Sequence, residues 1–190
     1  MVKRTDSEED FELKVRQHVE RLRQHTCQAI ESEVARKRIA WVKDHYQAAS
    51  DRPSPRRAYE LLFFDYMGLP ENDLPVLSES AIEIVWLSRN RCSTLEATQK
   101  LGLDTRLICR AAYEKSTQAF LSQVDPQLRF LRSYAEIRPY ANHCQEMIIR
   151  VDFEEMMKIA IDEAKASKRD GNKGYGAVVV LGRQILAQAH

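Results

Sequence analysis

Glycine, proline and long apolar runs are scarce in this sequence, and neither sign of charge is in large excess. Six glycines and six prolines occur among 190 residues, and the formal net charge is +1. No run approaches the 18 apolar residues of a membrane helix, and the opening MVKRTDSEED lacks the apolar core of a signal peptide. A net charge near zero creates no field that attracts nucleic acid or an anionic membrane. We therefore expect a cytoplasmic protein with no membrane partner and no strong nucleic-acid signal.

Common zinc motifs and disulfide scaffolds are also missing. None of the five histidines is followed two positions later by glutamate, and no two of the four cysteines have Cys-x-x-Cys spacing. Four widely separated cysteines without an export signal indicate reduced thiols rather than a disulfide framework.

The first third of the sequence predicts helices. Residues 8–47 contain no glycine or proline and place apolar residues on one helical stripe opposite a charged face. Thr26 and Glu33 interrupt the heptads of a coiled-coil arm, so we expect one or two helices packed on a domain. After a proline-containing break at 49–57, residues 57–67 have the apolar density of a buried helix, and Gly68 suits the left-handed position that follows a helix. Four aromatic residues of this segment are expected in the core rather than in a ligand cavity: Tyr59, Phe63, Phe64 and Tyr66.

Strand patterns then follow. Residues 76–79 and 81–88 contain short alternating or β-branched runs that suit a half-buried sheet. Residues 128–137 and 143–151 are expected to pair antiparallel across a turn that contains Pro139.

Between these strands the sequence predicts two more helices. Ser93 and Glu96 match a capping box at the start of the first, and Gly102 ends it. The second covers residues 105–123 and stops at Asp125. The order of helices, strands, helices and strands predicts an α+β fold, with a long N-terminal helix and other helices packed on a mainly antiparallel sheet.

The last forty residues combine a helix with a β-hairpin. The helix places its apolar residues at the spacing of one buried face: Phe153, Met156, Met157, Ala160, Ile161 and Ala164. Residues 175–181, a Gly182-Arg183 turn and residues 185–190 are typical of a hairpin. The strand G-Y-G-A-V-V-V after an E-A-K helix resembles the start of the cytidine and deoxycytidylate deaminase superfamily, which includes guanine and tRNA adenosine deaminases.

This resemblance implies hydrolytic deamination in a longer form of the protein. Members of the superfamily use a water activated by zinc, which one histidine and two cysteines hold, and a glutamate that moves the proton. Their H-x-E and P-C-x-x-C motifs do not occur in these 190 residues. We therefore expect residues 152–190 to be the truncated opening of a partial α/β/α deaminase-like domain of a bacterial protein. Zinc and a nucleobase or nucleoside are expected for the full-length form, but no cofactor is assured in this chain.

A second resemblance covers residues 57–151. It rests on W-L-S-R-N-R-C-S-T-L-E-A from Trp86, L-G-L-D-T-R-L-I-C from Leu101, D-P-Q-L-R-F from Asp125 and N-H-C-Q-E from Asn142. These segments resemble the L-2-amino-thiazoline-4-carboxylic acid hydrolase family and, more distantly, the four-vinyl-reductase small-molecule-binding domains. The resemblance implies a hydrolase-like or ligand-binding domain, but it carries over no individual catalytic residue.

Three cysteines of this region are candidate metal ligands. Cys92, Cys109 and Cys144 fall at a helix start, one helix later and in a strand, so their thiolates could converge on zinc. A fourth ligand would come from Glu114, His143 or Glu146. The alternative is that the thiols are small buried apolar groups, which is the commoner role of free cysteine.

Cys92 is also a candidate nucleophile. Its position at a helix N-terminus, near Arg89 and Arg91, would stabilise a thiolate. No histidine or aspartate partner can be assigned to it from the sequence.

The sequence therefore predicts two parts. Residues 1–151 are expected to form an α+β accessory or small-molecule-binding domain, and residues 152–190 a deaminase-like helix and hairpin whose unfinished sheet favours self-association. The predicted function is that of a fragment of a nucleoside or nucleobase deaminase, inactive as supplied. The alternatives are a small-molecule sensor and a cysteine-dependent hydrolase.

Overall fold

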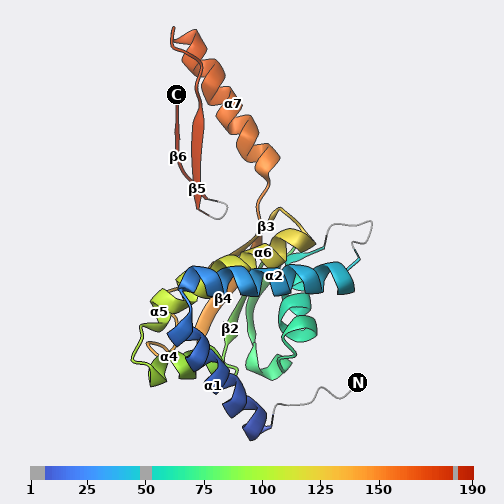
Figure 1. Ribbon diagram of the computed structural model, residues 1–190. Helices are drawn as coiled ribbons and strands as arrows, with labels where there is room; N and C mark the ends of the chain where they lie inside the picture. Colours follow the sequence, from blue (N-terminus) through green and yellow to red (C-terminus); the bar gives the residue numbers. More distant parts are fainter. Residues whose placement is uncertain (1–6, 48–52, 182–183) are drawn as a thin grey trace. The chain divides into compact units, whose positions relative to one another are not determined.

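The chain has an α+β fold, as the sequence predicts (Figure 1). A computed structural model describes residues 7–47, 53–181 and 184–190. The chain divides into two compact units, Met1–Ile149 and Arg150–His190. Within the described residues, no helix is both long enough and apolar enough to cross a membrane.

The N-terminal region forms two helices, α1 (Glu8–Gln24) and α2 (Cys27–His45). His25 ends α1 in an extended conformation. The Thr26 hydroxyl then accepts a hydrogen bond from the backbone N–H of Ala29 at 3.2 Å and so caps α2. The interruption at Thr26 is therefore a break between two helices, whereas Glu33 lies within α2.

The next helical segment joins α3 (Pro55–Glu60) to a π-helix, η1 (Leu61–Tyr66). The Ser54 hydroxyl caps α3, which places the start of the helix two residues before the predicted one. Gly68 follows with a φ of +69°, and this left-handed conformation confirms the predicted helix end. A short 3₁₀-helix, η2 (Glu71–Asp73), leads to the sheet.

The helix α4 (Ser93–Lys100) begins with Cys92 rather than Ser93 as its N-cap. The Cys92 thiol accepts a hydrogen bond from the backbone N–H of Leu95 at 3.4 Å. The predicted capping box of Ser93 and Glu96 is therefore wrong by one residue, because a cysteine takes the place of the hydroxyl.

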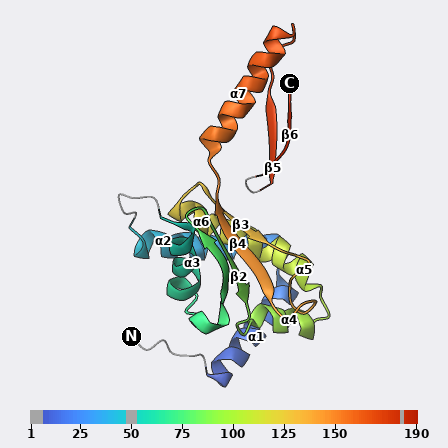
Figure 2. The ribbon, with the colours of Figure 1, turned by 180° about the vertical axis from the view of Figure 1, so that it is seen from behind.

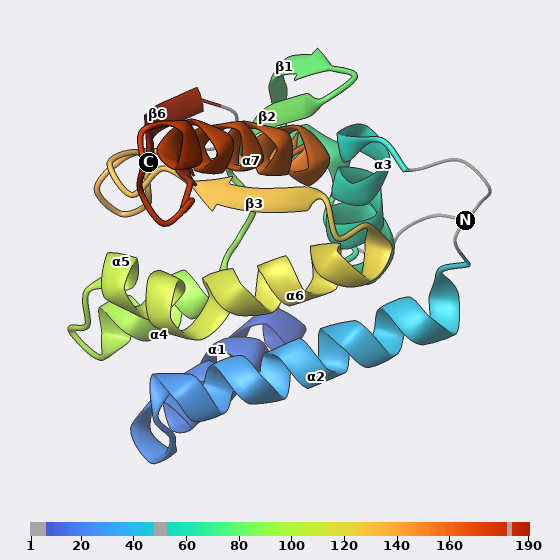
Figure 3. The ribbon, with the colours of Figure 1, turned by 90° about the horizontal axis from the view of Figure 1, so that it is seen from above.

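Three further segments follow one another without a break: α5 (Thr105–Ile108), the π-helix η3 (Cys109–Glu114) and α6 (Lys115–Val124). Asp125 caps the C-terminal end of α6, as predicted. The helix α6 packs between α2 and the sheet (Figure 3), while α1 packs against α4.

The sheet of the first unit is antiparallel and has the order β1-β2-β4-β3. Its strands are β1 (Val76–Ser80), β2 (Glu83–Ser88), β3 (Leu128–Arg132) and β4 (Cys144–Arg150). The central strands β2 and β4 run side by side (Figure 2), with Trp86 opposite Glu146. The strand β3 ends five residues before the predicted limit of 137.

The strand β2 is buried on both of its faces, from Ile84 to Ser88. The predicted half-buried strand is therefore wrong, because β2 occupies a central position in the sheet and carries apolar residues on alternate faces. Trp86 lies at the centre of an aromatic cluster with Tyr59 at 5.0 Å and Phe63 at 5.1 Å between ring centroids. Tyr59 and Phe63 belong to the core, as the sequence predicts, and Phe64 packs against it. Tyr66 also packs against the core but lines a pocket, so the prediction that it does not line a cavity is wrong.

The second unit consists of α7 (Phe153–Arg169) and a hairpin of β5 (Ala177–Leu181) and β6 (Gln184–Ala189). Its predicted Gly182-Arg183 turn lies outside the described residues. Gly176 allows the hairpin to approach α7, because a Cβ atom there would lie 2.0 Å from the carbonyl oxygen of Ala160. The backbone of this helix and the hairpin is therefore in close contact at a position where only glycine fits.

The predicted buried face of α7 is largely open to solvent within the chain. Phe153, Met157 and Ile161 are 41%, 61% and 46% exposed. The hairpin is also too small to cover the helix, since every residue of β6 is exposed. His190 bonds to Glu163 and Asp170 at 2.8 and 2.9 Å.

Candidate functional site

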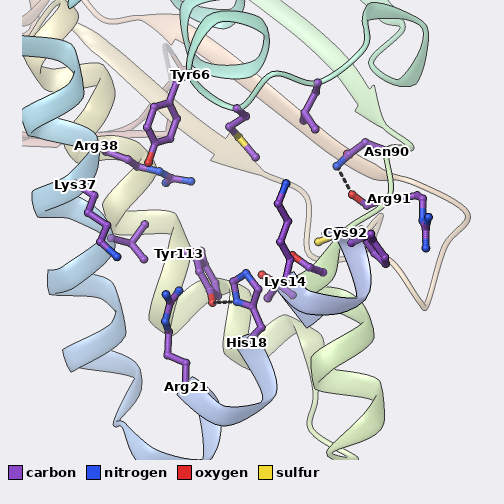
Figure 4. Close-up of a pocket in the computed structure, with 16 residues that line it drawn as sticks. Lys14, His18, Arg21, Lys37, Arg38, Tyr66, Asn90, Arg91, Cys92 and Tyr113 are labelled. Atoms are coloured by element: carbon purple, nitrogen blue, oxygen red, sulfur yellow. Dashed lines mark hydrogen bonds between the residues drawn. The ribbon is translucent and has the colours of Figure 1, made fainter. Parts of the chain in front are cut away.

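A pocket of about 340 Å³ lies within the first unit (Figure 4). Its walls come from α1, α2, η3, the start of α4 and the segment that follows η1. Residues far apart in the sequence therefore meet there.

Five of the described side chains that line the pocket are basic and none is acidic. The basic residues are Lys14, Arg21, Lys37, Arg38 and Arg91. Described carboxylates outside the lining pair with three members of this set. Glu33 pairs with both Arg21 and Lys37, and Glu8 pairs with Arg91.

Arg38 is the most unusual of these cations because it is buried without a carboxylate. Its side chain reaches from α2 toward α6, where one Nη donates to the hydroxyls of Ser116 at 2.9 Å and Thr117 at 2.6 Å. The residue is 8% exposed, and its Nε–H has no hydrogen-bond partner. Among the described residues, no acidic group forms an ion pair with it. Burial, which favours the neutral form, lowers the pKa of Arg38.

His18 adds a titratable group beside these cations. Its Nδ1 lies 3.1 Å from the hydroxyl of Tyr113. Burial, and then the positive charge of Arg21, lowers the pKa of His18 to about 4, so the imidazole is neutral at pH 7. Burial also raises the pKa of Tyr113.

The start of α4 forms the side of the pocket that faces α2 (Figure 4). The Asn90 side chain donates to the carbonyl oxygen of Arg91 at 2.9 Å and holds this turn. The guanidinium of Arg91 lies over the ring of Phe11 at 3.7 Å and bonds to Glu8 at 2.6 Å, which ties α1 to α4. The N-terminus of α4, with its partial positive charge, therefore adds to the field of the basic side chains.

A buried ion pair lies between β3 and β4. The Arg132 Nε donates to Glu146 at 2.8 Å, and the other carboxylate oxygen accepts from Ser88 at 2.6 Å and from Trp86 at 3.2 Å. Glu146 is 4% exposed. Burial acts to lower the pKa of Arg132, but the Glu146 carboxylate outweighs it and the pKa is raised. Glu146 therefore forms an ion pair with Arg132 and is not placed as the predicted metal ligand.

The three candidate cysteines are electrostatic neighbours, but they form no metal site. Each of Cys92 and Cys144 contributes to the raised pKa of Cys109, so all three lie in one region of the unit. Only Cys92 lines the pocket. Within the described part of the chain, no three histidine, cysteine, aspartate or glutamate side chains are grouped so that they could hold a metal ion. The described residues therefore do not fit zinc.

The chemistry of Cys92 is that of a protonated thiol. Burial raises its pKa, and this outweighs the backbone N–H of Leu95 and the positive charge of Arg138, which lower it. Arg138 thus takes the part expected of Arg89 and Arg91. Among the described residues, no histidine or carboxylate bonds to the Cys92 thiol. The nucleophile hypothesis stays a prediction.

The other proposed metal ligands have different partners. Glu114 accepts a hydrogen bond from the hydroxyl of Tyr134, and His143 lies 3.4 Å from Glu136. Burial raises the pKa of Cys109 to about 12, which favours its thiol form. Glu114 and His143 therefore contact other protein side chains rather than the cysteines.

Sequence reasoning missed the basic residues of the pocket. A signal was present on α1, where Lys14, His18 and Arg21 are spaced i, i+4 and i+7 beside the buried Phe11 and Val15. Cationic residues next to a buried stripe indicate that the face is not simply solvated. The residues around Arg38 in the sequence give no signal of its burial, because that burial depends on contacts with α6.

No family model matches the chain, and no curated protein matches it at a significant level. The two family resemblances therefore remain predictions.

Proposed function

We propose that the first unit is a small-molecule-binding module whose ligand is an anion. The observation that carries this proposal is the buried guanidinium of Arg38, which has only hydroxyl partners among the hydrogen bonds of its Nη groups. A buried charge without a counter-ion costs several kcal/mol, and a bound anion would offset that cost. The basic lining of the pocket and the N-terminus of α4 act in the same direction.

The size of the pocket suits a small molecule. About 340 Å³ lies near the lower end of the range of about 300–1,000 Å³ for small-molecule sites. The neutral His18 and the hydroxyl of Tyr113 supply hydrogen-bonding groups that fix the orientation of a ligand. The proposal is for binding, since no described histidine or carboxylate bonds to the Cys92 thiol to take up its proton.

Isothermal titration of the full chain with inorganic phosphate at low ionic strength tests the proposal. We expect saturable binding that Arg38→Met weakens by roughly tenfold or more, since a charge-assisted hydrogen bond contributes about 1.5–3 kcal/mol. Arg36→Met is the matched control, because Arg36 lies on the same helix, is exposed and does not line the pocket. Equal binding by the Arg38→Met variant and the wild-type chain would refute the proposal.

The deaminase resemblance concerns the second unit and stays a prediction. The helix and hairpin of the second unit are the elements that the resemblance implies. For this chain we expect no ammonia release from cytosine, guanine or adenine compounds, because H-x-E and P-C-x-x-C are absent from its sequence. Zinc-dependent ammonia release at enzymatic rates would contradict this prediction.

A further inference from the structure

We propose that the ligand of the pocket is a phosphate monoester that carries an apolar body. This inference rests on the proposed anion-binding function and specifies the chemical class of the anion. It follows from three features of the lining: the number of cations, the positive N-terminus of α4 and an apolar wall.

Arg21, Lys37 and Arg38 together have one described carboxylate partner, Glu33. Glu33 lies 3.8 Å from Arg21 and 2.5 Å from Lys37, so one carboxylate serves two cations. Arg38 forms no ion pair with a described acidic residue. One negative charge on a ligand would leave part of this excess uncompensated. A phosphate monoester carries between 1.5 and 2 negative charges at pH 7, as an order of magnitude, and so matches the site better than a monocarboxylate.

The start of α4 adds the positive end of a helix dipole to this charge. Ser93 and Thr94, the first two residues of this eight-residue helix, line the pocket. The Cys92 thiol already accepts a hydrogen bond from the N–H of Leu95, so this turn attracts an anion chiefly through the partial positive charge of the helix N-terminus. Arg38 is the independent evidence for a ligand, because it is more than nine-tenths buried, points into the same pocket and retains an unpartnered Nε–H (Figure 4).

The remaining wall is apolar and open. Met67 and Leu69 line the pocket from the segment that follows η1, and Met67 is 42% exposed. Tyr66 completes this wall and is fixed from behind by Trp41, whose ring centroid lies 5.3 Å away. Inorganic phosphate would fill a small part of about 340 Å³ and leave this wall in contact with water. An aryl or alkyl group on the phosphate would cover it.

Isothermal titration of the full chain with phenyl phosphate, inorganic phosphate and benzoate tests the inference. We expect phenyl phosphate to bind at least tenfold more tightly than either of the other two anions. Met67→Ser should weaken phenyl phosphate by several-fold and leave inorganic phosphate unchanged, because the exposed methionine contacts only the apolar body. Arg38→Met should weaken both phosphates. Lys37→Met, a change at an exposed side chain, repeats that test without disturbing the core.

The outcomes separate this inference from the proposed function. Binding of none of the three anions would overturn both. Equal affinities for phenyl phosphate and inorganic phosphate, or equal losses of the two in Met67→Ser, would overturn the apolar body and leave the anion site standing. Benzoate binding as tight as that of phenyl phosphate would overturn the assignment to a phosphate.

Discussion

Replacement of Glu146 by leucine is expected to destabilise the first unit by about 3–5 kcal/mol. The carboxylate is 4% exposed and accepts hydrogen bonds from Arg132, Ser88 and Trp86. Without it, Arg132 becomes a buried charge with no counter-ion, and its side chain is only 13% exposed. One Nη of Arg132 is already buried without a hydrogen-bond partner, so the loss of the carboxylate adds to an existing deficit of acceptors around the guanidinium.

The double variant Arg132→Met/Glu146→Leu separates the charge effect from the loss of packing. Removal of both partners leaves no buried charge, so we expect it to recover at least half of the stability lost in the single variant. The recovery is incomplete because Ser88 and Trp86 still lose an acceptor, at a cost of about 1–3 kcal/mol.

Urea unfolding followed by tryptophan fluorescence measures these free energies. Both tryptophans, Trp41 and Trp86, belong to the first unit, so the signal reports on that unit alone. Glu12→Gln is the control, because Glu12 forms an exposed ion pair with Lys100 at 3.6 Å and should change stability by less than about 1 kcal/mol. A loss below about 1 kcal/mol in Glu146→Leu, or a double variant as unstable as the sum of the two single ones, would refute the reasoning.

Three further predictions concern pH, packing and metal. The pKa of His18 is about 4 in the folded chain and about 6.5 in the unfolded chain, so the stability it contributes is present above pH 6.5 and lost toward pH 4. This loss is roughly 2 kcal/mol for a partly exposed group, and urea unfolding of His18→Asn at several pH values should show a correspondingly flatter dependence. Gly176→Ala should release the hairpin from α7 and speed amide exchange in β5, and unchanged exchange in β5 would contradict the close contact. The purified chain should contain no stoichiometric zinc. One zinc per chain that is lost in Cys92→Ser would instead support the predicted cysteine zinc site.

Local sequence patterns were enough to predict the α+β class and most of the helices and strands. Thr26, Gly68 and Asp125 mark helix ends because capping and turn preferences act within a few residues. The change from helical to alternating apolar spacing predicted where the strands lie, because this spacing is also a property of neighbouring residues. Errors arose where a neighbour in space decided the outcome, as for β2, whose central place in the sheet buries both faces.

The pocket, and the burial and protonation of its residues, depend on tertiary contacts. Arg38 becomes a buried cation because α6 packs on α2, and Glu146 meets Arg132 and Trp86 because of the register of β4. Cys92 was found from its place at a helix start, but burial reverses the direction of its expected pKa shift. Such properties depend on desolvation and on charges brought close by folding, and neither is encoded in the residues adjacent in the sequence.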